Sequence, residues 1–204
     1  MIAMLIAGCK GNSNEAKTGE AKEIATTDSV VAEQYVVEAG ASELKWVSTK
    51  ISGKTHDGHV PVSGGTVGIM NGKIASGKFG ITIAGLSVDD IKDPADNKDL
   101  VEHLRDTDFF SAMQYPMGEF SITSVKYTSE DSAIVAGNLT IKGISNNIEF
   151  PALIHLADGK LTAAGKFSID RTKWGLSYHA GKSWKDKMIL DNIDFDLKLE
   201  ANKQ

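Results

Sequence analysis

Hydrophobic and polar residues alternate with a period of two along most of the chain from Tyr35 onward. Strict alternation indicates segments with one buried face and one face in water, the usual state of antiparallel strands. The chain is therefore predicted to be all-β. The alternating apolar positions include Phe79, Ile81 and Ile83; Phe120 and Ile122; Leu139 and Ile141; Phe167 and Ile169; and Ile193, Phe195, Leu197 and Leu199.

Turn signals separate these segments. Asn71-Gly72 and Asp158-Gly159 each lie between alternating runs, and both residues of such a pair tolerate the positive φ that a tight hairpin needs. The polar stretch 129–132 reads as a loop. The runs predict about eight strands, the number at which a closed barrel can just hold one small ligand. We expect an eight-stranded antiparallel β-barrel.

One segment departs from the strand pattern. Pro94 suits the first turn of a helix, and Leu100, Val101 and Leu104 follow at helical spacing through Arg105. This predicts a short helix between strands that caps or flanks the barrel.

An apolar cluster of four residues follows the predicted helix: Phe109, Phe110, Met113 and Met117. Two interpretations stay open. The cluster packs the helix onto the sheet, or it forms a mouth of adaptable side chains around an entering lipid tail.

The N-terminus resembles a targeting signal. The chain opens with an apolar run that is too short to span a bilayer and ends in Ile6-Ala7-Gly8-Cys9, which is similar to the bacterial lipoprotein cleavage box. This resemblance implies a signal peptide over residues 1–8 and a lipid anchor on Cys9, since several acyl chains make anchoring stable. No Lys or Arg precedes the run, so the signal would be complete only if it begins further upstream.

Residues 9–33 are predicted to be a flexible, lipid-anchored linker, and residues 34–204 the barrel domain. From Lys10 to Glu33 the linker is polar and has no aromatic residue, so it cannot bury enough apolar surface to offset its chain entropy. The competing interpretation is a short amphipathic helix over Ala21–Ala25.

Composition narrows the function classes. The formal net charge of −5 comes with interspersed acids and bases and no basic stripe, which argues against a nucleic-acid partner. The single Cys, at position 9, excludes an intramolecular disulfide. We find no Gly-x-Ser-x-Gly elbow and no Walker-type loop, so the chain is not expected to be an enzyme. His56 and His59 could present imidazoles to a metal, but they are interpreted as polar turn residues, and neither a metal nor a cofactor is expected.

Three stretches, in order, are similar to segments of one family. Residues 102–110, EHLRDTDFF, followed by Tyr115-Pro116 and Phe120, resemble the "HLRSxDFFD…YP…F" segment of the YceI-like family. Residues 137–144 resemble its "GxLTxxGVT" strand and turn, and residues 167–176 its "FxxxRxxFGL" segment. Trp46, His56 and Gly58 also fit the opening hairpin of a common subgroup. The resemblance runs from about Tyr35 to Glu200.

The resemblance implies a periplasmic, lipocalin-like barrel that binds polyisoprenoids and does not catalyse a reaction. The ligand would be a long isoprenoid or quinone-like lipid, stored or carried in an internal hydrophobic tunnel at the cell envelope. Two features depart from the family: an anchor at Cys9 where a cleaved secretory signal is usual, and Trp174 where Phe is common. Because Lys10 replaces the Asp that marks inner-membrane retention in enteric bacteria, we expect an outer-membrane anchor, with the domain in the periplasm or at the cell surface.

Candidate ligand-binding residues are the inward apolar positions, the cluster after the helix, and two residues near a strand end. Small residues between the large ones can leave a cavity or can interdigitate with them, so a filled barrel serving as an anchored structural or interaction lipoprotein stays open. Arg171 would meet a lipid head group, or else fix the barrel rim through a salt bridge. The candidates are Phe79, Ile81, Ile83, Phe109, Phe110, Met113, Met117, Phe120, Ile122, Leu139, Ile141, Phe150, Phe167, Ile169, Arg171 and Trp174.

Overall fold

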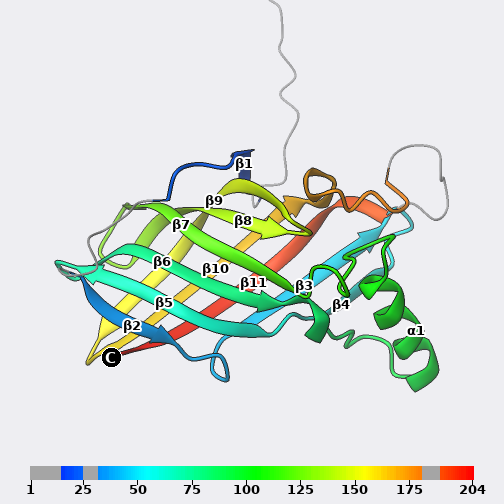
Figure 1. Cartoon of the computed structure of the whole chain (residues 1–204), viewed down its shortest axis with the longest axis horizontal. Helices are drawn as coiled ribbons and strands as arrows, with labels where there is room; N and C mark the ends of the chain where they lie inside the picture. The colour runs from blue at the N-terminus through cyan, green and yellow to red at the C-terminus, as the bar shows by residue number, and fades with distance from the viewer. Residues whose placement is uncertain (1–14, 25–31, 181–188) are drawn as a thin grey trace, which may run out of the picture.

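A computed structural model describes residues 15–24, 32–180 and 189–204 of the chain. Antiparallel strands dominate it, with one α-helix and two short 3-10 helices (Figure 1). The elements are β1 (Lys17–Glu20), β2 (Glu33–Val37), β3 (Glu43–Lys50), β4 (Thr55–His59), β5 (Val62–Met70), β6 (Lys73–Thr82), η1 (Ile83–Gly85), α1 (Pro94–Arg105), β7 (Met117–Tyr127), β8 (Ser132–Ile141), β9 (Ile144–Ala157), β10 (Lys160–Asp170), η2 (Arg171–Trp174) and β11 (Ile189–Lys203).

Eight of these strands close into a barrel, which confirms the predicted fold class. Their order is β9-β8-β7-β6-β5-β2-β11-β10, and β10 pairs back onto β9. The long strand β11 pairs with β2 near its C-terminal end and with β3 over the rest of its length. β4 pairs with β3. The β3–β4 hairpin therefore extends the barrel wall at one end.

The two predicted hairpin turns are confirmed. Asn71 and Gly72 have φ values of 54° and 72°, and Asp158 and Gly159 have 52° and 73°. Positive φ at both central residues gives a turn whose twist matches the flanking strands. Both turns lie at the end of the barrel that also holds the C-terminus, which we call the far end.

The predicted helix is also confirmed and lies at the opposite end, which we call the helix end (Figure 1). The side chain of Asp93 caps α1 by accepting hydrogen bonds from the amides of Ala95 and Asp96, at 2.9 and 3.1 Å. Pro94 occupies the first turn, where its missing N–H costs nothing. Within the described ranges, no helix has the length and apolarity needed to cross a membrane.

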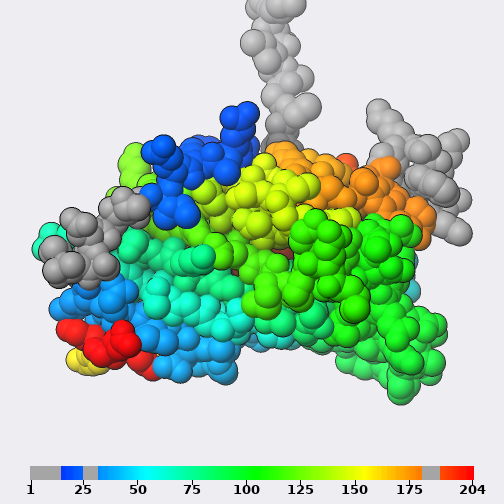
Figure 2. All heavy atoms as spheres, viewed as in Figure 1, coloured from blue at the N-terminus to red at the C-terminus, as the bar shows by residue number. Residues whose placement is uncertain are grey.

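The N-terminal segment differs from the predicted linker over its described part. β1 pairs with β9 from Lys17↔Glu149 to Glu20↔Asn146, and residues 21–24 are not helical. The amide of Ala16 also donates to the carbonyl of Ser168 on β10, at 2.9 Å. The β9–β10 ladder stops at Leu153↔Ala164, so the two strands are not paired beyond this point. β1 lies there, along the unpaired part of β9 and on the outside of the barrel (Figure 2).

Hydrogen bonds to its backbone explain why this segment leaves no apolar pattern in the sequence. Asn138 on β8 donates to the carbonyl of Lys22 at 2.6 Å, and its side-chain oxygen accepts from the amide of Lys22 at 3.0 Å. Asn147 donates in turn to the side-chain oxygen of Asn138, at 3.0 Å. A segment held mainly in this way needs few apolar side chains, so composition alone suggests a linker.

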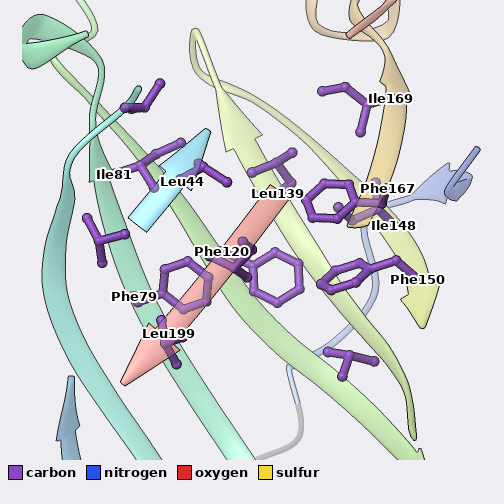
Figure 3. Packing of buried hydrophobic residues seen from close by; sticks show 14 of the residues in the cluster. Leu44, Phe79, Ile81, Phe120, Leu139, Ile148, Phe150, Phe167, Ile169 and Leu199 are labelled. Atoms are coloured by element: carbon purple, nitrogen blue, oxygen red, sulfur yellow. The ribbon is translucent and has the colours of Figure 1, made fainter. Parts of the chain in front are cut away.

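A row of aromatic rings crosses the middle of the barrel, and Figure 3 labels Phe79, Phe120, Phe150 and Phe167 of this row. Successive ring centroids lie 5.4, 5.8, 4.3 and 5.5 Å apart, and β6, β7, β9, β10 and β11 each contribute one ring. We call these five residues the phenylalanine stack. In order, they are Phe79, Phe120, Phe150, Phe167 and Phe195.

Glycines make room for the stack. A Cβ at Gly137 would lie 2.2 Å from the ring of Phe120, and one at Gly165 would lie 3.1 Å from the ring of Phe150. Large and small residues therefore interdigitate at this level, and the middle of the barrel is filled. This packing separates the interior at the helix end from the interior at the far end.

A candidate lipid-binding cavity at the helix end

A cavity of about 360 Å³ lies at the helix end, between the barrel wall and α1. Most of its lining atoms are apolar. Its lining comes from β3, β4, β11 and α1, from Val60 and Leu86, and from the chain around residues 109–110 and 178–179. A volume of this size lies at the lower end of the range of small-molecule sites.

The β3 side of the cavity becomes more polar with distance from the barrel centre. Alternation directs Trp46, Ser48 and Lys50 of β3 to the cavity. In the ladder with β11, Trp46 pairs with Phe195, while Lys50 pairs with Ile189 at the outer end. The inner end of the wall is therefore aromatic, and the outer end carries an ammonium group.

The helix closes the other side. Leu100, His103 and Leu104 of α1 line the cavity, because positions three and four apart share one face of a helix. Arg105 holds this face against the barrel by donating to the carbonyl of Leu86 at 3.0 Å. Asn97 adds hydrogen bonds to two carbonyls of the preceding loop, at 2.7 and 3.0 Å.

Aromatic rings surround His103. Its ring centroid lies 4.6 Å from that of Tyr178 and 6.3 Å from that of Phe109, and Phe109 lies 5.2 Å from Phe110. Within the described part of the chain, the imidazole nitrogens of His103 form no hydrogen bond. Phe110 and Tyr178 are only partly buried, which is expected of side chains facing a cavity.

Charged hydrogen bonds fix the loop that precedes α1. His56 lies 2.9 Å from Asp90, and the two ring nitrogens of His59 contact Glu43, at 3.0 Å, and Asp89. Burial opposes ionisation of Asp90, but hydrogen bonds from His56 and from a backbone amide outweigh it and lower the pKa of Asp90.

These carboxylates engage both imidazoles that sequence inspection weighed as metal ligands. Among the described residues, no three His, Cys, Asp or Glu side chains converge on a point that could hold a metal ion. The imidazole of His56 also lines the cavity and adds to the polar groups near its opening.

Only two of the predicted ligand-binding residues line this cavity, namely Phe109 and Phe110. Their neighbours in the predicted mouth do not. Met113 is 99% exposed and Met117 is 46% exposed, so both side chains lie on the surface. A turn begins at Ser111, which has a φ of 50° and whose carbonyl accepts hydrogen bonds from the amides of Gln114 and Tyr115, both at 2.9 Å. Neither methionine therefore lines the cavity, as the mouth interpretation would have it.

Another group of predicted residues lies beyond the cavity. Phe79, Phe120, Ile122 and Phe150 line a second space, of about 40 Å³, toward the far end. Phe167 lines neither space and stands between them in the phenylalanine stack. In the described part of the chain, the interior is therefore divided, and the expected single tunnel is not present.

The remaining predicted residues are buried in the core and line neither space. Trp174 is fully buried, and its indole N–H donates to the carbonyl of Leu139 at 2.9 Å. A ring that is tied down in this way acts as part of the wall. The others in this group are Ile81, Ile83, Leu139, Ile141, Ile169 and Arg171.

Arg171 has a structural role at the rim. It is fully buried, and its guanidinium donates to the carbonyls of Leu176, Ile189 and Leu190, the last two at 3.2 Å. Burial lowers the pKa of Arg171, and the nearby Asp191 and Asp170 partly offset that effect. Because the guanidinium is buried and donates to these three carbonyls, it does not face a ligand head group. The same hydrogen bonds connect the start of β11 to η2. Cys9, the predicted anchor, lies outside the described residues.

Most of the lining was missed by sequence reasoning. Leu100 and Leu104 were recognised only as the apolar face of a helix, and Phe195 only as an inward strand position. Ser48 and His103 carry no local signal, because a polar residue at an inward position looks like an interruption of the pattern. The sequence signal that could have located the cavity is the apolar face of the predicted helix, because such a face packs against another apolar surface.

A family profile described as the YceI-like domain matches residues 35–201. The chain belongs to the YceI-like family. UPF0312 proteins from several strains of Pseudomonas putida, GB-1 among them, are 36% identical to it over 103 residues. The match covers 50% of this chain and 53% of those proteins, so the chain spans about half the length of the curated relatives it matches.

Solved structures share the fold of this YceI-like chain. BcnA of Burkholderia cenocepacia superposes with a TM-score of 0.65 at 22% identity, covering 81% of this chain and 99% of BcnA. A polyisoprenoid binding domain from Saccharophagus degradans, implicated in plant cell wall breakdown, superposes with a TM-score of 0.64 at 15% identity. That match covers 89% of this chain and all of the other. At these identities, the likeness establishes the fold alone.

Proposed function

We propose that this protein binds an amphipathic lipid, with the apolar chain in the cavity and the polar group at its outer end. The observation that carries the proposal is the cavity of about 360 Å³, with Trp46 and Phe195 at its inner end and Lys50 at its outer end. A chain entering from the polar end would meet increasingly apolar walls.

The energetics favour such a ligand. Each methylene removed from water contributes about 0.8 kcal/mol, so a chain that fills the cavity gains enough to hold a lipid out of bulk water. A hydroxyl, carbonyl or phosphate at the outer end would lose part of its hydration. His103, Tyr178 and Lys50 offer it hydrogen bonds or charge in return.

An isoprenoid or quinone-like lipid is the proposed ligand class. Support comes from membership of the YceI-like family and from the Saccharophagus degradans relative, which is described as polyisoprenoid binding. The unbranched alternative, a fatty acid or fatty alcohol, has the same two-ended chemistry. Competition between farnesol and a saturated alcohol of equal length would separate the two classes.

To test binding, we fill the cavity with a larger side chain on α1. Leu100 is partly buried and lines the cavity, so L100W should fill part of the cavity without disturbing the barrel. We expect at least about tenfold weaker farnesol binding, measured by competition dialysis. K98W adds the same ring to α1 at a position outside the cavity lining and should bind as the wild type does. Equal farnesol affinity in L100W would contradict the proposed site.

We further propose that the domain is held at the cell envelope through a lipid on Cys9. The support is the sequence Ile6-Ala7-Gly8-Cys9 alone. C9S expressed in the native host should leave the membrane fraction while the domain stays folded. If C9S still sediments with membranes as the wild type does, the anchor is elsewhere.

The second candidate function is that of an anchored structural or interaction protein with a filled barrel. The packed middle of the barrel is the observation that favours it. It would stand if the wild-type protein, purified from its own host, released no lipid on organic extraction and bound none of the alcohols above.

A further inference from the structure

The phenylalanine stack lies between two spaces of very different size. Phe195 lines the large cavity, while Phe79, Phe120 and Phe150 line the small space of about 40 Å³. Phe167 stands between Phe195 and Phe150, with centroid distances of 5.5 and 4.3 Å to them. Its ring is therefore the partition through which a longer chain would have to pass.

The cavity volume limits what fits in front of this partition. A buried apolar cavity of about 150 Å³ admits benzene, with six carbons, so about 360 Å³ corresponds to about fifteen heavy atoms. A longer chain would have to leave its remainder in solvent or displace the stack. The second course is costly, because the ring of Phe167 stacks on those of both Phe150 and Phe195 and packed cores deform little.

We propose that Phe167, within the phenylalanine stack, is a length stop that sets the chain length accepted by the cavity. The ligand portion that the protein recognises is then about fifteen heavy atoms, the size of a chain of three isoprene units. This inference rests on the proposed function and adds to it a limit on ligand length.

A chain-length series tests the stop. Geraniol, farnesol and geranylgeraniol differ by one isoprene unit each, and each buried methylene is worth about a factor of four in affinity. For the wild-type protein, competition dialysis should give at least about a tenfold gain from geraniol to farnesol, and less than about a threefold gain from farnesol to geranylgeraniol. A further tenfold gain at geranylgeraniol would overturn the length stop.

Variants locate the stop. F167A should join the two spaces and restore about a tenfold preference for geranylgeraniol over farnesol. F167L keeps more of the packing and should shift the preference in the same direction, so it serves if F167A does not fold. F79L is the matched control, since Phe79 lies at the other end of the stack and does not line the large cavity. It should keep the wild-type length profile.

The outcomes distinguish the two proposals. If none of the three alcohols binds the wild-type protein, the proposed lipid binding fails. If they bind and the length profile is the same in the wild type, F167L and F79L, lipid binding stands while the assignment of the stop to Phe167 fails.

Discussion

The two ends of this barrel have the same alternating sequence pattern but different interiors. At the far end and in the middle, rings and glycines interdigitate, and the space left is about 40 Å³. At the helix end, β3 and β11 face a helix instead of another barrel wall, and about 360 Å³ stays open. Alternation thus decides which face of a strand is buried. The element that faces this strand, a helix or another strand of the barrel, decides whether the interior is filled.

The largest expected effect is a loss of stability on substitution in the filled part of the barrel. Phe120 is buried in the middle of the stack, so F120A should lower the free energy of unfolding by about 4 kcal/mol through lost burial and a residual cavity. F110A is the matched change at the open end. Phe110 is only partly buried there, so F110A should cost about 1 kcal/mol.

Urea denaturation measures both variants, and lipid competition sharpens the contrast. F110A should weaken farnesol binding more than it destabilises the fold, and F120A should do the opposite. Equal losses of stability in the two variants would mean that the helix end is packed as tightly as the middle.

A somewhat smaller effect is expected at the rim between η2 and β11. R171L removes three hydrogen bonds to backbone carbonyls and should lower the free energy of unfolding by about 3 kcal/mol. K173L, an exposed neighbour on η2, should change it by less than about 0.5 kcal/mol. Thermal unfolding of both proteins checks this. A stable R171L would leave the guanidinium free for a ligand role after all.

The smallest effect is a pH dependence at the loop before α1. Because the folded pKa of Asp90 is lowered, its contribution to stability is complete above the unfolded pKa of about 4 and is lost as the pH falls through the folded value. The stability difference between wild type and D90N should therefore be constant near pH 5 and shrink toward pH 3. Denaturation at these pH values measures it, and a difference that grows on acidification would reverse the sign we assign.

Much of the fold was predictable because its signals are local. Alternation located most of the barrel strands, Asn71-Gly72 and Asp158-Gly159 located two turns, and Pro94 marked the start of the helix. β1 was not predictable from its composition, because backbone hydrogen bonds and Asn138 hold it in place.

The cavity was much less predictable than the fold. Phe167 and Phe195 occupy equivalent inward positions on paired strands, yet one is a partition and the other a lining residue. Their roles depend on ring packing across strands and on the position of α1, which a linear pattern does not encode. Met113 shows the converse limit, since an apolar residue in a loop carries no period from which burial can be inferred.

A crystal structure of the protein with farnesol bound tests the division of the interior most directly. Density for the chain should lie between α1 and β3, with the hydroxyl near Lys50 or His103 and the chain ending against Phe195 and Phe167. Density continuing past Phe167 into the space beside Phe120 and Phe150 would contradict the account.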